Sequence, residues 1–136
     1  MKACFLVLIA FVAISPVLGQ SESDFRVSVN LSGDGVVIDK YLGKEKIVVI
    51  PATIQGFPVR EIGERVFERT YDVISVTIPE GVTKIGKVAF LGCFYLASLT
   101  LPSSLRYIGE EAFMYCHSLP LPTQAQLRKL GYEGRF

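Results

Sequence analysis

Residues 78–102 read IPEGVTKIGKVAFLGCFYLASLTLP, and residues 101–119 return to the same pattern as LPSSLRYIGEEAFMYCHSL. The dipeptide Ile-Gly marks the period, because it recurs every 23 residues, at positions 62–63, 85–86 and 108–109. A fixed period in this range is typical of a stacked solenoid. The sequence therefore predicts a repeat solenoid.

Three further sets of residues recur at the same 23-residue interval, and each set is called a column of the repeat. They are Phe67, Phe90 and Phe113; Thr70, Cys93 and Cys116; and Val73, Leu96 and Leu119. One coil cannot bury these residues alone, so neighbouring coils must stack and share a core. Pro79 and Pro102 lack an N–H and are expected to end strands. The segment between Ile-Gly and Cys is too short for a stable helix. We therefore expect a short stack, mainly β strands, with one helical or 3₁₀ turn per coil.

Residues 1–19 have the layout of a secretory signal peptide. Lys2 precedes an apolar run, and cleavage is expected after Gly19. The apolar run is shorter than the roughly 20 residues that span a bilayer. A lipid anchor would need a cysteine after the cleavage site, where Gln20 stands. We expect a secreted, periplasmic or cell-surface protein with no membrane insertion after cleavage.

The remaining chain is electrically balanced. The full sequence has 14 basic and 13 acidic residues, and removing Lys2 leaves 13 of each. This balance argues against nucleic acid, acidic polymers or an anionic membrane as the main partner.

Residues 20–49 are predicted to form an N-terminal β cap. Phe25, Val27 and Val29 alternate with polar residues, as in a half-buried strand. A Gly-rich turn over 32–35 leads into a second strand, and residues 47–50 form a third. Such a cap would cover the first coil, whose open edge would otherwise face water.

The repeats are expected over residues 50–122, and the period slips after Leu119. Two interpretations of residues 123–136 stay open. A capped helix could run from Thr123 to Leu130, with Gly131 beyond its end. Alternatively, residues 127–131 with Phe136 are a degenerate copy of the repeat. Either arrangement would partly cover the last coil.

The two copies resemble the BspA-type leucine-rich repeat, also called the treponemal type. A coil of this family reads as a proline-ended strand, an Ile-Gly turn and Ala-Phe-x-Gly-Cys. Residues 89–93 match this ending, whereas Tyr115 and Arg69 replace its glycine in the neighbouring coils. The resemblance implies a non-enzymatic interaction module, secreted or on the surface. Several members are adhesins, which implies an extracellular matrix or envelope protein as partner.

No catalytic or metal site is expected. His117 is the single histidine and follows Cys116, but adjacent side chains rarely face one substrate and no third orienting group is evident. Cys93, Cys116 and His117 lack the paired spacing and the fourth ligand of a zinc site. We therefore expect no enzyme activity and no cofactor.

Cys93 and Cys116 occupy equivalent positions in neighbouring coils. Stacked positions lie roughly 4.8 Å apart, within the Cα separation of roughly 4.4–6.8 Å that a disulfide needs. Parallel side chains seldom reach the required dihedral angle. Reduced core cysteines are favoured, and a disulfide is the alternative.

The candidate binding site is a surface. Its predicted members are the hydroxyls on the concave sheet and the aromatic residues along one rim, namely Ser75, Thr77, Ser98 and Thr100, with Tyr71, Phe94, Tyr95 and His117. Aromatic residues on a rigid frame bury a large area at low entropic cost. For Phe94, exposure and packing over the coil end are equally supported. The alternative function is a structural envelope protein that self-associates through its C-terminal repeat edge.

Overall fold

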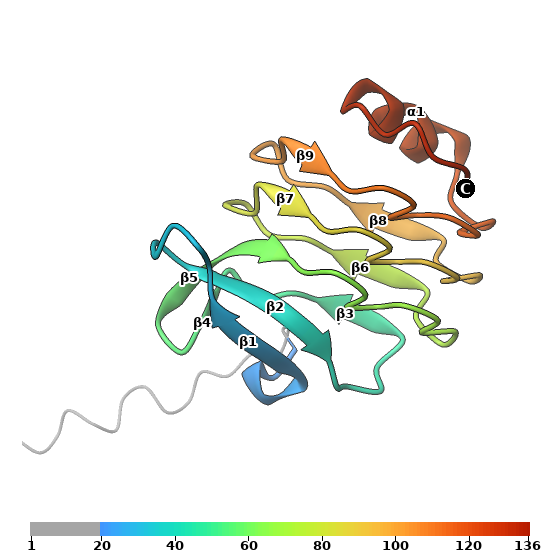
Figure 1. The fold of residues 1–136 in the computed structure, drawn as a ribbon. Helices are drawn as coiled ribbons and strands as arrows, with labels where there is room; N and C mark the ends of the chain where they lie inside the picture. The colour runs from blue at the N-terminus through green and yellow to red at the C-terminus, as the bar shows by residue number, and fades with distance from the viewer. Residues whose placement is uncertain (1–19) are drawn as a thin grey trace, which may run out of the picture.

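The computed structural model describes residues 20–136, so the predicted signal peptide lies outside the described residues. The chain winds into a β-solenoid whose coils stack along one axis (Figure 1). Its elements, in chain order, are η2 (Glu22–Asp24), β1 (Phe25–Val29), β2 (Val36–Tyr41), β3 (Ile47–Val49), β4 (Thr53–Ile54), β5 (Phe57–Ile62), β6 (Ser75–Thr77), β7 (Lys84–Ile85), β8 (Ser98–Thr100), β9 (Tyr107–Ile108) and α1 (Leu121–Lys129).

Two sheets run along the solenoid. The first has the order β1-β2-β5-β7-β9, with β4 paired to β5 beside this path. Strands β2, β5, β7 and β9 are parallel, and β1 is antiparallel to β2. The second sheet, β3-β6-β8, is wholly parallel and pairs Ser75 with Ser98 and Thr77 with Thr100. The two residues of each pair are 23 positions apart, so the sequence period sets the register of the sheet.

The third side of each coil is a chain of tight turns. In the middle coil, Ala89 donates to the carbonyl of Gly86, and Cys93 donates to that of Phe90, at 3.3 and 3.1 Å. These i→i+3 bonds are of the 3₁₀ type, although they do not add up to a continuous helix. The turns require a left-handed residue at Arg69, Gly92 and Tyr115, where φ is 56°, 75° and 65°. The glycine of the family pattern therefore has a conformational cause.

The Ile-Gly glycines are explained by close approach between coils. A Cβ on Gly109 would lie 2.5 Å from the backbone nitrogen of Lys87, and one on Gly86 would lie 2.8 Å from that of Glu64. Any side chain at these positions would push the coils apart.

The core is organised around the phenylalanine column. Phe90 stacks against Phe67 at 4.9 Å and against Phe113 at 5.1 Å between ring centroids, with interplanar angles of 5° and 7°. Tyr41 continues the column at 5.1 Å from Phe67, and Tyr132 meets Phe113 edge-on at 5.6 Å. All five rings are buried. The column thus runs through the whole stack.

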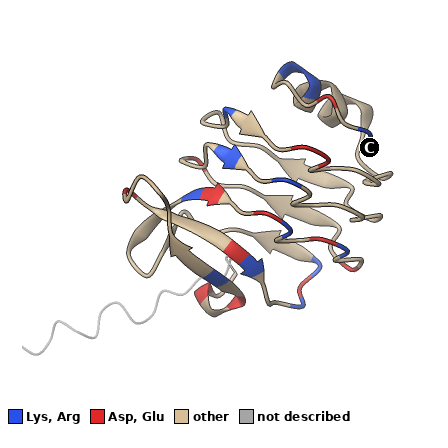
Figure 2. Cartoon of the chain, in the orientation of Figure 1, with Lys and Arg blue, Asp and Glu red and all other residues tan. Residues whose placement is uncertain are grey.

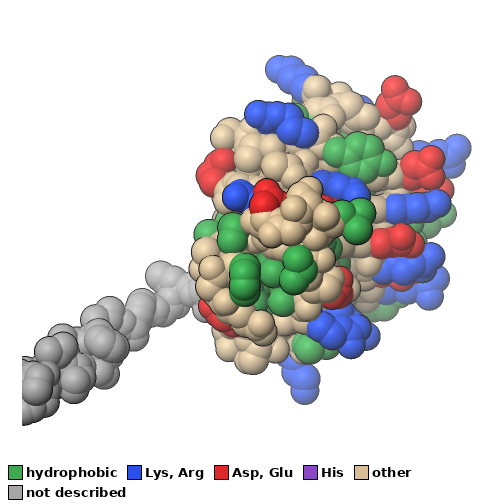
Figure 3. Space-filling view, turned by 60° about the vertical axis from the view of Figure 1, so that its left-hand side comes forward, with side chains coloured by type: hydrophobic (Ala, Val, Ile, Leu, Met, Phe, Trp, Pro, Cys, Tyr) green, Lys and Arg blue, Asp and Glu red, His purple; other side chains and the backbone are tan. Residues whose placement is uncertain are grey.

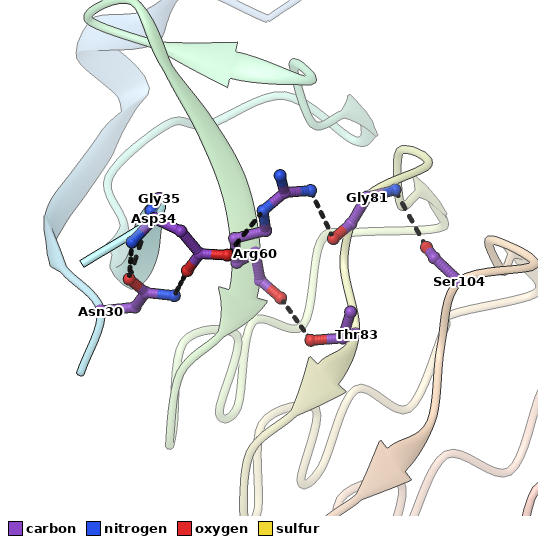
Figure 4. A network of polar contacts seen from close by, with 7 residues as sticks. All are labelled: Asn30, Asp34, Gly35, Arg60, Gly81, Thr83 and Ser104. Carbon is purple, nitrogen blue, oxygen red and sulfur yellow. Dashed lines mark hydrogen bonds and ion pairs between the residues drawn. The ribbon is translucent and has the colours of Figure 1, made fainter. Parts of the chain in front are cut away.

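Strands β1 and β2 form a hairpin that continues the first sheet beyond β5 (Figure 1). The side-chain oxygen of Asn30 accepts from the N–H of Asp34 at 3.1 Å, and its amide donates to the Asp34 carboxylate at 2.8 Å. That hydrogen bond from Asn30 is the main reason that the pKa of Asp34 is lowered. Asp34 lies 3.7 Å from Nε of Arg60, whose Nη1 donates to the carbonyl of Gly81 at 3.4 Å (Figure 4). Polar contacts therefore join the hairpin to two successive coils.

A helix follows the last coil. Helix α1 begins at Leu121, two residues before the range of the helical interpretation, and Gly131 follows its end with φ of 95°. Leu127 and Tyr132 are buried against the last coil. The hydroxyl of Tyr132 accepts from the N–H of Phe113 at 3.2 Å and donates to the carbonyl of Arg135 at 2.9 Å.

This hydroxyl occupies the place of a backbone carbonyl. In the earlier coils, Phe67 donates its N–H to the carbonyl of Ala89, and Phe90 donates to that of Ala112, at 2.7 and 2.8 Å. Among residues 20–136 no further coil follows that of Phe113, and Tyr132 supplies the acceptor instead. The last buried N–H of this ladder is thereby satisfied.

Candidate binding surface

Tyr71, Phe94 and His117 form an exposed stack, here named the aromatic rim. The ring centroids of Tyr71 and Phe94 lie 5.5 Å apart at an interplanar angle of 5°, and those of Phe94 and His117 lie 5.9 Å apart at 9°. Tyr71 is 47% exposed and Phe94 is 40% exposed. His117 is exposed as well. The structure therefore brings three predicted site residues together in one row.

The backbone beneath the aromatic rim is held by hydrogen bonds. Phe94 donates its N–H to the carbonyl of Gly92 at 2.9 Å. The Ser118 hydroxyl donates to the carbonyl of Phe94 at 2.7 Å and so links the last two coils at the rim. The backbone that carries Phe94 is thus tied both within its own coil and to the next one.

Two further tyrosines flank the aromatic rim. Tyr95 is 64% exposed and stacks on no other ring among residues 20–136. Tyr115 is 46% exposed and meets the ring of His117 edge-on at 5.9 Å. It also lines a shallow depression of about 250 Å³ together with Tyr71 and Phe94. Sequence reasoning missed Tyr115, because it was interpreted only as a departure from the family glycine.

Two strands of the sheet β3-β6-β8 follow residues of the aromatic rim along the chain, since β6 comes after Tyr71 and β8 after Phe94. Ser98 and Thr100 are exposed, and Ser75 and Thr77 are half-buried. None of the three strands carries a charged residue (Figure 2). The first strand differs from the other two, because Ile47 and Val49 take the place of the hydroxyl residues. Neither side chain was predicted from the sequence to be part of the binding surface.

The side chains of His117 and Cys116 lie in different environments. The imidazole is exposed on the aromatic rim, whereas Cys116 is fully buried and its thiol donates to the carbonyl of Phe90 at 3.1 Å. Within residues 20–136, no three His, Cys, Asp or Glu side chains are placed to hold a metal ion. In the same range, no helix is both long and apolar enough to cross a bilayer.

Both cysteines of the repeats are free thiols, so the disulfide alternative is not realised in this structure. The thiol of Cys93 donates to the carbonyl of Phe67 at 3.0 Å, one coil back, as Cys116 does to Phe90. The neighbouring thiol of Cys93, together with burial, raises the pKa of Cys116 far above that of a free thiol. The two side chains therefore act as small, neutral core residues that tie coil to coil.

Comparisons with known proteins agree with this geometry. The model of the family described as "BspA type Leucine rich repeat region (6 copies)" matches residues 48–132. The crystal structure of the T. pallidum leucine rich repeat protein is similar, with a TM-score of 0.73 and 37% identity, over 75% of this chain and 48% of that one. No curated protein matches the chain.

Two other crystal structures are also similar. One is a leucine rich cell surface protein from Faecalibacterium prausnitzii, with a TM-score of 0.66 and 34% identity, over 77% of this chain and 30% of that one. The other is a leucine-rich repeat protein from Bacteroides capillosus, with a TM-score of 0.65 and 32% identity, over 71% of this chain and 74% of that one. The chain thus spans less than half of the first two proteins. On its repeat, its fold and these similarities, the chain belongs to the BspA-type leucine-rich repeat family.

Proposed function

We propose that the chain is a protein-binding module that works at the cell surface or outside the cell. Its partner is an extracellular matrix or envelope protein, and binding serves adhesion to a host matrix or to other cells. The contact is made by the aromatic rim, by Tyr95 and Tyr115, and by the hydroxyl-bearing face of β6 and β8. Binding by shape and aromatic contact requires no cofactor and no chemical step.

The observation that carries this proposal is the exposed, pre-ordered stack of Tyr71, Phe94 and His117. Aromatic side chains dominate the energetics of many protein interfaces, because they bury a large area with few rotatable bonds. Here the rings also stack on one another, with centroids 5.5 and 5.9 Å apart, so little side-chain conformational freedom remains to be lost on binding. The uncharged strands beside them add hydrogen-bonding groups without a strong electrostatic preference.

One sequence prediction and one comparison support the location. The predicted signal peptide at 1–19 would direct export. The similar protein from F. prausnitzii is described as a cell surface protein.

The proposal is tested with a variant that combines Tyr71→Ala, Phe94→Ala and Tyr95→Ala. We expect its binding to immobilised extracellular matrix proteins, measured by biolayer interferometry, to weaken about tenfold or more. Phe57→Ala is the matched control, because Phe57 is an aromatic residue with 54% exposure on β5, away from the rim. Wild-type affinity in the triple variant, with an unchanged thermal transition, would remove the rim from the interface.

Self-association is the second candidate function, and it is favoured by the outer edges of β8 and β9, which pair with no strand within residues 20–136. Leu121, at the start of α1, is also 78% exposed at this end of the solenoid. Light scattering over a concentration series checks it. A concentration-dependent oligomer that disappears when residues 123–136 are replaced would favour self-association, and a monomer throughout would exclude it.

A further inference from the structure

The first sheet ends at β9 with an unused hydrogen-bond acceptor. In every preceding step, the Ile-Gly glycine donates its N–H to an isoleucine carbonyl one coil back. These bonds join Gly63 to Ile38, Gly86 to Ile62 and Gly109 to Ile85, each at 2.8 Å. The next acceptor in the series is the carbonyl of Ile108, and no donor among residues 20–136 reaches it. The ladder therefore stops at an open strand edge.

An open notch lies beside this edge. It has a volume of about 370 Å³, and β9 with Gly109 forms one wall while residues 131–134 form the other. Tyr132 satisfies the nearby N–H of Phe113 but does not bond to Ile108. The C-terminal segment thus closes the core and leaves the edge of β9 accessible from outside. Exposed strand edges are the sites at which extended peptides add to a sheet.

Charges along the coils indicate which kind of strand would fit. Glu61 pairs with Lys84 at 3.5 Å, and Lys87 pairs with Glu110 at 3.3 Å, so acidic and basic positions face each other between neighbouring coils. Acidic and basic side chains alternate along the right-hand side of the molecule in Figure 3. These pairs belong to two columns of the repeat: the one with Lys87 reaches the notch at Glu110, and the one with Lys84 reaches it at Tyr107. The charged residues that line the notch are all acidic, namely Glu110, Glu111 and Glu133.

Close packing adds a requirement for glycine. The coils approach so closely that a Cβ on Gly86 or Gly109 would collide with the backbone of the preceding coil. A strand that continued the ladder would lie against Gly109 and Glu110 in the same way. The residue that donates to Ile108 must therefore be a glycine.

We propose that the outer edge of β9 binds an extended, basic polypeptide segment of another protein by strand addition. A glycine N–H of that segment bonds to the carbonyl of Ile108, and flanking Lys or Arg side chains face Glu110, Glu111 and Glu133. This site is separate from the aromatic rim and does not depend on the function proposed for it. Because β9 has two residues, the contact is short and its affinity is modest.

The probe is a synthetic peptide with the sequence of residues 82–88, Val-Thr-Lys-Ile-Gly-Lys-Val. In the intact chain this sequence forms β7 and makes the equivalent contact with β5. Fluorescence anisotropy measures its binding to the full chain. Methylation of the glycine nitrogen removes the donor without changing the protein, and we expect it to weaken binding about tenfold. Replacing that glycine by alanine should weaken binding as well.

Charge reversal on the protein gives the second arm. The double variant Glu110→Lys and Glu111→Lys changes exposed side chains and should abolish binding of the basic peptide. The matched control is Glu45→Lys with Asp72→Lys, which changes net charge equally at an exposed site elsewhere and should leave binding intact.

Three outcomes would overturn the proposal. The first is no binding of the peptide at millimolar concentration. The second is equal binding of the N-methylated peptide, which would mean charge attraction without strand addition. The third is a dimer of the chain that uses this edge and persists in excess peptide, which would assign the edge to a second copy.

Discussion

Two aromatic columns with the same 23-residue step run along this solenoid, one inside and one outside. In the inner column, the rings of Phe67, Phe90 and Phe113 are fully buried, and their centroids lie 4.9 and 5.1 Å apart. In the outer column, the aromatic rim, the ring centroids lie 5.5 and 5.9 Å apart on the surface. The near-parallel geometry is common to both and follows from the repeat. Burial is what differs, and it separates a column that stabilises the fold from one that is free to bind.

The largest expected difference between the columns comes from removing one ring of each. Phe90→Ala should lower the free energy of unfolding by about 3–5 kcal/mol, because it leaves a cavity between two buried rings. Phe94→Ala, in the same coil, should cost less than about 1 kcal/mol, because that ring is already partly hydrated. Urea denaturation of both variants checks this. Equal losses would mean that the outer column is structural.

The C-terminal end of the inner column gives the next largest effect. Tyr132→Phe keeps the ring but leaves the buried N–H of Phe113 without an acceptor, which should cost about 1–3 kcal/mol. Tyr95→Phe is the matched control, because its exposed hydroxyl makes no hydrogen bond with any residue in the range 20–136, and stability should not change. Hydrogen exchange at the Phe113 amide should accelerate in Tyr132→Phe alone. An unchanged rate would contradict the capping role.

Tyr132 also makes the free energy of unfolding depend on pH in the alkaline range. Burial raises the pKa of Tyr132 above its ordinary value, and burial likewise raises that of Tyr41. The folded state therefore favours the neutral phenol. The stabilisation is complete below the unfolded pKa of about 10 and is lost as pH rises above it. The alkaline decline in unfolding free energy should be shallower in a Tyr41→Phe, Tyr132→Phe double variant. An identical slope would show that these phenols do not titrate with unfolding.

The smallest expected effect lies beside the outer column. Tyr115 has φ of 65°, which costs a non-glycine residue about 1–2 kcal/mol. A glycine would avoid this cost, but it would lose more backbone entropy on folding, so only part of the cost would be recovered. Tyr115→Gly should therefore raise the free energy of unfolding by about 0.5 kcal/mol, as measured by thermal denaturation. Under the proposed function, it should also weaken binding at the rim. A clear loss of stability would mean that the ring contributes more by packing than its backbone strain costs.

Much of the fold could be predicted, because the period maps directly onto the register of the stack. Residues 23 apart pair in the second sheet, and the phenylalanine and cysteine columns are buried as expected. The glycines of the Ile-Gly dipeptides, which mark the period in the sequence, lie where neighbouring coils approach closely.

The remaining features depend on where the period fails. The helix at the C-terminus could not be separated from a degenerate repeat, because Tyr132 has no equivalent in the other coils. Its role appears only when the N–H of Phe113 is traced to its acceptor. The exposure of Phe94 was undecided for a different reason, since periodicity fixes which residues stack but not which side of the backbone they occupy. Tyr115 was missed because a pattern match registers it as an absent glycine.

Because the hydroxyl of Tyr132 caps the last coil, repeat units could be added without changing the segment that ends the stack. Every internal coil presents the same backbone groups to its successor, and at Phe113 a single side chain takes the place of the next coil's carbonyl. A duplicated unit inserted before Pro120 would therefore meet the same terminal segment and require no redesign of it. Each insertion would also lengthen the outer row by one ring. The number of contact points could thus be changed by gene duplication while folding of the terminus stays constant.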